Sequence, residues 1–272
     1  MTHPPAPNAL TIAGSDSGGG AGIQADLKTF SALGVYGSTV ITALTAQNTR
    51  EVRAIQEIPP AFIASQLDAV LDDIEIDAIK IGMVGRPEAI TTIAAILRQR
   101  GLGNIVLDPV MVAKSGDKLL ADESIEALRA ELLPLASLIT PNLPEAAALL
   151  GVAAATDAAA MLSQARQLQA LGPAAVLLKG GHLAPSASGQ SNDLLLIGAQ
   201  SHWLPARRIA TVNTHGTGCT LSSAVAAGLA KGLEMRAAVS AAKRYITAAI
   251  GAADRLRVGS GHGPTHHFHA WW

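Results

Sequence analysis

Apolar residues along the chain follow two different spacings, which alternate from one end to the other. Short aliphatic runs, such as residues 9–13 and 78–81, are typical of buried strands. Between them lie longer segments in which apolar residues recur every three or four positions, as in residues 62–74, which is typical of amphipathic helices. This alternation predicts an α/β fold with a central, mostly parallel sheet flanked by helices on both faces.

Eight short apolar runs are the candidate strands. They cover residues 9–13, 35–43, 78–81, 105–107, 138–140, 176–178, 194–197 and 203–204. The clearest helices are expected at residues 22–33, 62–74, around Ile90–Leu97, 218–229 and 237–256. No internal repeat or low-complexity linker interrupts the pattern, so we predict a single domain over residues 1–272.

Glycines and polar residues follow five of the predicted strands. These stretches are residues 14–22, 82–83, 108–110, 141–142 and 179–182. Ligands of open α/β sheets bind beyond the carboxyl ends of the strands, where such loops meet. The sequence therefore predicts an active site at this edge of the sheet, although fold geometry alone does not identify its chemistry.

Composition narrows the class of protein. Hydrophobic residues make up 49% of the chain and charged residues 15%, which is ample material for a large core. The net charge of -1 and the lack of a basic run argue against a nucleic-acid-binding protein. The apolar windows are too short to cross a bilayer, and the first residues do not have the pattern of a secretory signal, so a cytoplasmic location without membrane association is expected. The single cysteine, Cys219, excludes a disulfide within the chain and a multi-cysteine metal site.

The glycine-rich stretch 14–22 follows a predicted strand and begins a predicted helix. Glycines let the backbone approach a ligand closely, and the start of a helix offers free amides. The stretch does not fit the G-x-G-x-x-G spacing, because Ile23 stands where the third glycine belongs, and the chain contains no Gly-Lys dipeptide for a P-loop. A merely tight turn remains the alternative to a ligand-binding loop.

Residues 214–219 read Thr-His-Gly-Thr-Gly-Cys and precede another predicted helix. Backbone amides around Gly216 and Gly218, together with the positive end of the helix dipole, can form an anion hole for a phosphoryl group. Cys219 would lie in the first helical turn, where the pKa of a thiol tends to fall. The alternative is an ordinary glycine-rich turn followed by a small buried thiol.

Two further polar positions admit both a functional and a structural interpretation. Asn142 and Glu145 have the spacing of a helix capping box, but Glu145 could instead organise hydrated magnesium. The amide of Gln47 could pair with an aminopyrimidine, as glutamine pairs with adenine, or simply lie at the surface. His266, His267 and His269 have no neighbouring carboxylate, so we interpret the C-terminal segment as packing on the body of the protein.

Taken together, these motifs resemble those of the hydroxymethylpyrimidine/phosphomethylpyrimidine kinases of thiamine biosynthesis, in the pyridoxal-kinase-like branch of the ribokinase superfamily. The matching stretches run nearly from end to end and keep the order of the family. They are residues 9–14, 19–28, 40–49, 80–83, 107–111, 138–145, 179–182 and 213–219. Gly18 departs from the pattern, because the family usually has serine there.

The resemblance implies a ribokinase-like fold and a homodimer that uses ATP and Mg²⁺ to phosphorylate 4-amino-5-hydroxymethyl-2-methylpyrimidine and then its monophosphate. The family's site residues carry over onto matching positions of this chain. The implied substrate-binding residues are Gln47, Gly14, Asp26, Met83 and Val110. The implied ATP- or phosphate-binding residues are Lys179, Asn142, Thr217 and Asp108, with Glu145 holding magnesium through water. The implied catalytic residues are Cys219, Gly216 and Gly218, and most ribokinase relatives have an aspartate at the position of Cys219.

Two other functions stay open from the sequence. A pyridoxal or pyridoxine kinase would use the same fold for similar chemistry. A non-catalytic sensor would bind the pyrimidine without phosphorylating it, but such a protein would not need the glycine-rich start of the helix after residue 216. A redox enzyme that binds a dinucleotide is disfavoured by the glycine spacing.

Overall fold

The computed structural model describes residues 5–111, 121–183 and 189–272. Its strands are β1 (Asn8–Ala13), β2 (Tyr36–Ile41), β3 (Ala43–Gln47), β4 (Val52–Glu57), β5 (Ala78–Ile81), β6 (Ile105–Leu107), β7 (Leu138–Ile139), β8 (Ala175–Leu178), β9 (Asp193–Ile197) and β10 (Gln200–Leu204). Its α-helices are α1 (Gly22–Ala32), α2 (Pro60–Leu71), α3 (Pro87–Arg100), α4 (Asp122–Ala127), α5 (Leu143–Leu150), α6 (Ala158–Gln169), α7 (Thr217–Ala230) and α8 (Met235–Gly251).

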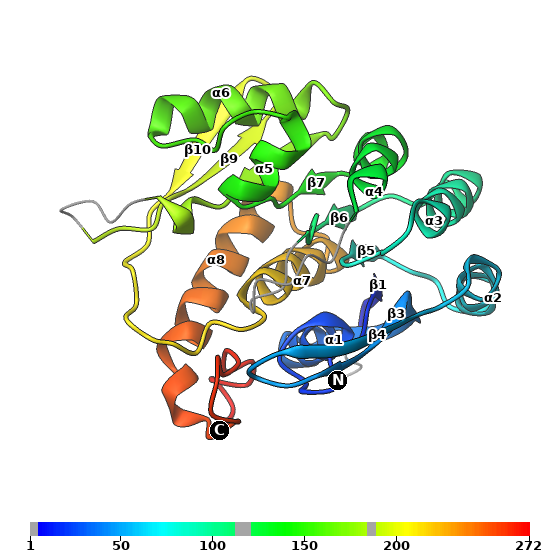
Figure 1. Cartoon of the computed structure of the whole chain (residues 1–272), viewed down its shortest axis with the longest axis horizontal. Helices are drawn as coiled ribbons and strands as arrows, with labels where there is room; N and C mark the ends of the chain where they lie inside the picture. The colour runs from blue at the N-terminus through cyan, green and yellow to red at the C-terminus, as the bar shows by residue number, and fades with distance from the viewer. Residues whose placement is uncertain (1–4, 112–120, 184–188) are drawn as a thin grey trace.

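An eight-stranded sheet in the order β10-β9-β8-β7-β6-β5-β1-β2 forms the centre of the molecule (Figure 1). The strands from β8 to β2 are parallel, and β9 runs antiparallel to both β8 and β10. Alternate side chains of each strand point to opposite faces. Leu10 and Ile12 of β1 therefore pack under α2 to α6, whereas Ala9 packs under α1, α7 and α8. The predicted α/β architecture is confirmed.

The structure corrects several details of the sequence-based prediction. The late β pair is confirmed as the antiparallel hairpin β9–β10. The apolar run 35–43 is divided between β2 and the start of β3, and β3 pairs with β4 in a separate two-stranded sheet. β4, α4 and α6 were not predicted, because most of β4 is exposed, α4 has only six residues and α6 begins in an alanine-rich stretch. The last long helix ends at Gly251 and not at Leu256.

No helix in the described part of the chain is both long enough and apolar enough to cross a membrane. The C-terminal segment packs on the body, as expected. The His267 imidazole lies 3.0 Å from the hydroxyl of Thr220 in α7, and the indole of Trp271 donates a hydrogen bond to the carbonyl of Ala32 at the end of α1. Burial lowers the pKa of His267 to about 3, so this ring is neutral at physiological pH.

The start of α5 is fixed by a reciprocal pair of hydrogen bonds. The Asn142 side chain accepts from the Glu145 amide at 2.8 Å, and the Glu145 carboxylate accepts from the Asn142 amide at 2.7 Å. This is the capping box that the sequence allowed. Glu145 is only 9% exposed, and burial raises its pKa to about 7. Lys179 opposes that rise, and the nearby Asp108 carboxylate adds to it.

The raised pKa of Glu145 makes stability depend on pH. Between about pH 4.5 and pH 7, the folded protein keeps a proton on Glu145 that the unfolded chain has already released. The free energy of unfolding must therefore fall as pH rises through this window. Glu145→Gln keeps an acceptor for the capping box but has no proton to release.

From pH 5 to pH 8, we expect the parent protein to lose about 1–3 kcal/mol more stability than Glu145→Gln. Urea unfolding of both proteins without ligands measures this difference. Glu88→Gln, at an exposed position in the first turn of α3, is the control and should show the pH dependence of the parent. A parent and a Glu145→Gln variant with parallel pH profiles would contradict the proposed buried, protonated carboxyl.

Candidate active site

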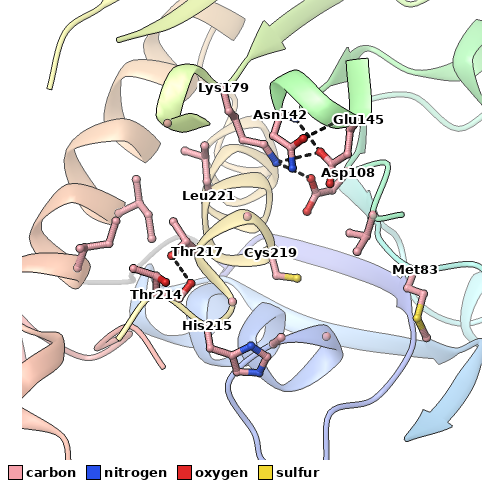
Figure 2. A pocket seen from close by; sticks show the side chains of 18 of the residues that line it. Met83, Asp108, Asn142, Glu145, Lys179, Thr214, His215, Thr217, Cys219 and Leu221 are labelled. Atoms are coloured by element: carbon pink, nitrogen blue, oxygen red, sulfur yellow. Dashed lines mark hydrogen bonds and ion pairs between the residues drawn. The ribbon is translucent and has the colours of Figure 1, made fainter. Parts of the chain in front are cut away.

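The loops that follow the parallel strands surround one cavity of about 830 Å³. It lies at the predicted edge of the sheet, where the carboxyl ends of β1, β5, β6, β7 and β8 meet. Its lining includes Gly14 after β1, Met83 after β5, Asp108 after β6 and Lys179 after β8. Cys219 reaches the same cavity from α7, as Figure 2 shows. This volume is in the upper part of the range of ligand pockets, about 300–1,000 Å³.

Nearly all of the predicted site residues lie on this cavity. Those that line it are Gly14, Gln47, Met83, Asp108, Val110, Asn142, Glu145, Lys179, Gly216, Thr217, Gly218 and Cys219. Asp26 is the exception.

The start of α7 requires glycine at residue 216. Gly216 has φ 75° and caps the helix, and a Cβ there would lie only 1.8 Å from the carbonyl oxygen of Gly20. A Cβ on Gly218 would lie 3.4 Å from Nζ of Lys179, so this lysine stands directly over the first turn. The helix begins at Thr217, and the first amides of a helix have no partner within it. The first turn of α7 and Lys179 together form a site for an anion.

Lys179 is held by two carboxylates. Its ammonium lies 3.1 Å from Asp108 Oδ1 and 3.8 Å from Glu145 Oε2. Burial alone would lower the pKa of Lys179, but Asp108 and Glu145 outweigh burial and raise it. Lys179 therefore stays charged at physiological pH. In Figure 2 this group lies at the top of the view, above Cys219, and Met83 lies at the right.

Asp108 does not have the position of a direct phosphate ligand. Its carboxylate is 1% exposed and accepts hydrogen bonds from Thr140 at 3.0 Å and from Lys179 at 3.1 Å. Burial alone would raise the pKa of Asp108, but the charges of Lys179 and Lys80 outweigh burial and lower it. A carboxylate that stays ionised would repel a phosphate. Asp108 instead holds Lys179, and the direct phosphate contact expected from the sequence is not supported by this position.

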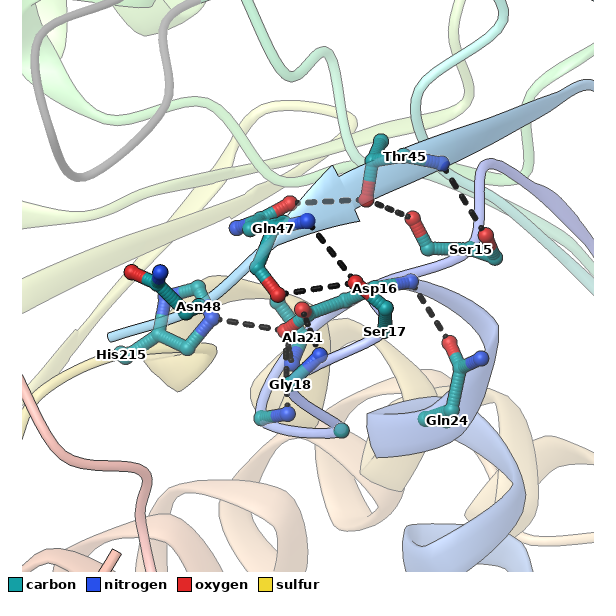
Figure 3. Close-up of polar contacts among 12 residues, drawn as sticks. Ser15, Asp16, Ser17, Gly18, Ala21, Gln24, Thr45, Gln47, Asn48 and His215 are labelled. Atoms are coloured by element: carbon teal, nitrogen blue, oxygen red, sulfur yellow. Dashed lines mark hydrogen bonds and ion pairs between the residues drawn. The ribbon is translucent and has the colours of Figure 1, made fainter. Parts of the chain in front are cut away.

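The glycine loop 14–22 is organised around the carboxylate of Asp16 (Figure 3). Its oxygens accept from the backbone amides of Gly18, Gly20 and Ala21 at 2.8–3.0 Å. The His215 ring nitrogen lies 2.8 Å from the same carboxylate, which ties this loop to the loop before α7. Burial alone would raise the pKa of Asp16, but the contact with His215 and these amides lower it. Sequence reasoning missed Asp16 and His215, although both lie within motifs that it identified.

Gln47 lies at the end of β3, where a bulge interrupts pairing with β4. Its backbone is held by the hydroxyl of Ser17, which donates to the Gln47 carbonyl and accepts from the Gln47 N–H, both at 2.8 Å. Its side-chain oxygen lies 3.2 Å from the hydroxyl of Thr45 (Figure 3). The Gln47 amide therefore lines the cavity from a fixed backbone, whereas the sequence also allowed a position at the surface.

Asp26 lies behind the cavity and not on its wall. Its carboxylate is fully buried and accepts from Thr11 at 2.6 Å, from Ser223 at 2.6 Å and from the Lys80 ammonium at 2.8 Å. A carboxylate with these three partners has no open path to a ligand. The expected direct contact between Asp26 and the substrate is therefore not supported by its position. Lys80, which does line the cavity, was not identified from the sequence as a site residue.

Cys219 differs from the sequence expectation in its acidity. Its thiol lies in the first turn of α7, as predicted, but burial raises its pKa to about 11. The charge of Lys80 opposes this rise, whereas the carboxylates of Asp26 and Asp108 add to it. The thiol is therefore protonated in the free protein at neutral pH. The lowered pKa that we expected from the helix terminus is wrong for the free protein, because burial outweighs the helix dipole.

The end of the cavity near α8 has apolar side chains beside basic ones such as Lys243. Leu221 of α7, Ile209 and the α8 residues Ile246 and Ile250 line it, and Lys243 lies close by with its ammonium 2.5 Å from Asp193. These residues carry no sequence signal of their own, because aliphatic side chains on helices are expected in the core. The cavity thus has a mixed apolar and basic end, a cationic middle at Lys179 and a polar end at Gln47.

Comparisons with known proteins agree with this geometry. The sequence profile of the family "Phosphomethylpyrimidine kinase" matches residues 16–266. A hydroxymethylpyrimidine/phosphomethylpyrimidine kinase of Rhizobium meliloti is 58% identical over 97% of this chain and 98% of its own length.

Two solved structures share the fold. The ADP complex of a Bacillus subtilis pyridoxal kinase superposes with a TM-score of 0.89 at 41% identity, and the match covers 97% of this chain and 98% of that one. A phosphomethylpyrimidine kinase of Clostridium difficile gives a TM-score of 0.78 at 46% identity, over 89% of this chain and 99% of that one. These likenesses confirm the ribokinase-like fold. The chain therefore belongs to the phosphomethylpyrimidine kinase family of enzymes.

Proposed function

We propose that this enzyme transfers the γ-phosphoryl group of ATP to 4-amino-5-hydroxymethyl-2-methylpyrimidine and then to the resulting monophosphate, in thiamine biosynthesis. One observation carries the proposal. The Lys179 ammonium lies directly over Gly218 in the first turn of α7, and the Cys219 thiol opens into the same cavity. Backbone amides and a fixed cation are what a migrating phosphoryl group needs, because its transfer depends mainly on positioning and charge stabilisation.

The nucleotide fits the half of the cavity near α8. An adenine ring would bury its faces against Leu221, Ile246 and Ile250, and its phosphates would extend toward Lys179 and the start of α7. The related pyridoxal kinase was solved with ADP, which supports nucleotide binding by this fold.

Magnesium fits the site only as a hydrated ion held mostly by phosphates. Within the described residues, no group of three or more histidine, cysteine or carboxylate side chains could hold a metal by itself. Glu145 offers one carboxylate close to Lys179, and Mg²⁺ commonly keeps several waters while it bridges phosphate oxygens. When bound with ATP, the ion would neutralise phosphate charge, and Glu145 would hold it through water.

The pyrimidine fits the other half of the cavity. The amide of Gln47 has one donor and one acceptor, which match a ring nitrogen beside an exocyclic amine. Gly14 lets the Met83 side chain pack against the loop after β1, because a Cβ there would lie 2.3 Å from the methyl group of Met83. With Val110 on the same wall, these residues would hold the ring so that its hydroxymethyl group points toward Cys219.

In the first step, the alcohol oxygen forms a bond to the γ-phosphorus while the bond between that phosphorus and the β–γ bridging oxygen breaks. The amides at Gly216–Cys219 and the Lys179 ammonium stabilise the charge on the transferring group. Cys219 is a thiol in the free protein and first has to release its own proton to water. The resulting thiolate then accepts the alcohol proton and becomes a thiol again. In the second step the acceptor is a phosphate monoester, whose second pKa is about 6, so at neutral pH it has little need of a base.

Pyridoxal kinase activity is the second candidate. It is favoured by the TM-score of 0.89 to a pyridoxal kinase that is 41% identical. Pyridoxal also carries a hydroxymethyl group on a nitrogen heterocycle and would use the same phosphoryl site.

Three properties stay predictions. A single domain and a cytoplasmic location accord with the proposed metabolic role. A homodimer accords with the exposed apolar side chains of Tyr36 on the edge strand β2 and of Leu44 and Ile55 on the β3–β4 pair. Analytical ultracentrifugation would measure the oligomeric state.

Purified protein with Mg-ATP should convert the pyrimidine alcohol first to the monophosphate and then to the diphosphate. Mass spectrometry over a time course would detect both products in that order, and pyridoxal in a parallel reaction should be phosphorylated with a lower kcat/KM. A faster reaction with pyridoxal, with no diphosphate from the pyrimidine, would instead establish the second candidate.

Replacing Cys219 separates a base from a residue that only shapes the cavity. We expect Cys219→Ser to lower kcat of the first step about 10²-fold, the low end for loss of general-base help. The kcat of the second step should fall less than about tenfold, because its phosphate acceptor is already mostly deprotonated at neutral pH. Cys219→Asp should recover part of the first step. Equal losses in both steps would show that Cys219 shapes the cavity and does not accept the proton.

A further inference from the structure

Lys80 is a fully buried cation at the cavity that the proposed reaction has not yet used. Its side chain is 0% exposed, yet it contributes to the lining. A Cβ at residue 82 would lie 2.6 Å from its Nζ, so Gly82 leaves the space that the ammonium occupies. Burial alone would lower the pKa of Lys80, but Asp26, Cys219 and Asp108 outweigh burial and raise it. Lys80 is therefore a permanent positive charge.

The contacts of Asp26 place this charge beside Cys219. One carboxylate oxygen of Asp26 binds Lys80 at 2.8 Å, and the other accepts from Ser223 of α7 at 2.6 Å. Ser223 follows Cys219 by four residues, so both side chains lie on one face of α7, one turn apart. Lys80 thus lies under the face of α7 from which the thiol enters the cavity.

Four charged groups act on the Cys219 thiol from the elements around it. Lys80 comes from β5, Asp26 from α1, Asp108 from the loop after β6, and Lys179 from the end of β8. Lys179 is already bonded to Asp108 and faces the phosphoryl site. Among these groups, the Lys80 charge has the largest opposing effect: it lowers the pKa of the Cys219 thiol, which burial raises.

We propose that Lys80 is a positioning residue whose ammonium, held in place by Asp26, stabilises the Cys219 thiolate that accepts the alcohol proton. The consequence for turnover rests on the proposed function. The electrostatic link between Lys80 and Cys219 does not, because it is a property of the protein without substrate.

Cys219 is the only cysteine of the chain, so its thiolate can be followed in the whole protein without interference. The test compares Asp26→Asn with the paired variant Lys80→Met/Asp26→Asn by the rate of alkylation with iodoacetamide from pH 7 to pH 10.5. The two variants share the Asp26 change and differ only by the ammonium. A charge at this range shifts a pKa by about one unit or more. We therefore expect alkylation in the paired variant to be at least about tenfold slower at pH values well below the pKa of the thiol, with the difference narrowing toward pH 10.5.

Asp26→Asn by itself should move the rate in the opposite direction. It removes a carboxylate that disfavours the thiolate, so alkylation should be faster than in the parent protein. Lys231→Met, at the exposed far end of α7, is the control and should match the parent. Cooperative thermal unfolding checks that each variant is folded. If the paired variant is not folded, Lys80→Gln is compared with Lys80→Arg, and only the arginine should keep the parent rate.

Equal alkylation rates with and without the ammonium would overturn this role and leave Lys80 as a structural partner of Asp26. Turnover provides the second readout. In the paired variant, kcat of the first phosphorylation should fall more than kcat of the second, with a smaller change in KM for the pyrimidine alcohol. A protein that shows the alkylation effect but does not phosphorylate the pyrimidine would refute the proposed function alone.

Discussion

The buried carboxylate of Asp26 joins the parts of the protein that build the active site. It lies in α1 and binds Thr11 of β1, Lys80 of β5 and Ser223 of α7, all at 2.6–2.8 Å. These elements carry the glycine loop, the Met83 loop and Cys219. Removing one partner of a buried ion pair usually costs about 3–5 kcal/mol, because the other charge is left without compensation. The pair therefore fixes β1, β5, α1 and α7 relative to one another.

Lysine and carboxylate charges alternate from this pair, in which Asp26 lies behind the cavity, to the phosphoryl site. Asp26 holds Lys80 behind the thiol, and Asp108 holds Lys179 over the start of α7. Each lysine is kept charged by a buried carboxylate. Electrostatic stabilisation of this kind is effective because the groups are already oriented when charge develops on the substrate. The same burial that orients them raises the pKa of Cys219, and a nearby cation has to offset that effect.

The position of the site followed from the sequence for a simple physical reason. The carboxyl ends of parallel strands meet at one edge, so polar residues after β1, β6 and β8 had to come together. The capping box at Asn142 and Glu145 depends on residues three apart and was equally readable. The exposed strand β4 was missed because it is recognisable only through its pairing with β3.

Interactions between distant residues were not readable in this way. Lys80 and Asp26 lie 54 positions apart, and a lysine in a buried strand reveals its role only when its partner is seen. The acidity of Cys219 was predicted in the wrong direction, because the helix terminus is visible in the sequence and the degree of burial is not. Asp16 and His215 are 199 positions apart and connect two motifs that the sequence presents separately.

The central claim is that the transferring phosphoryl group lies between the first turn of α7 and Lys179, next to Cys219. A crystal structure with Mg-ADP, aluminium fluoride and the pyrimidine alcohol tests it most directly, because the planar fluoride imitates the transferring group. We expect the fluoride to lie about 2.7–3.1 Å from the amides at Gly216–Cys219 and to contact the Lys179 ammonium, with the alcohol oxygen on the side of Cys219. A fluoride group bound away from α7, with Lys179 still engaged only by Asp108 and Glu145, would contradict the account.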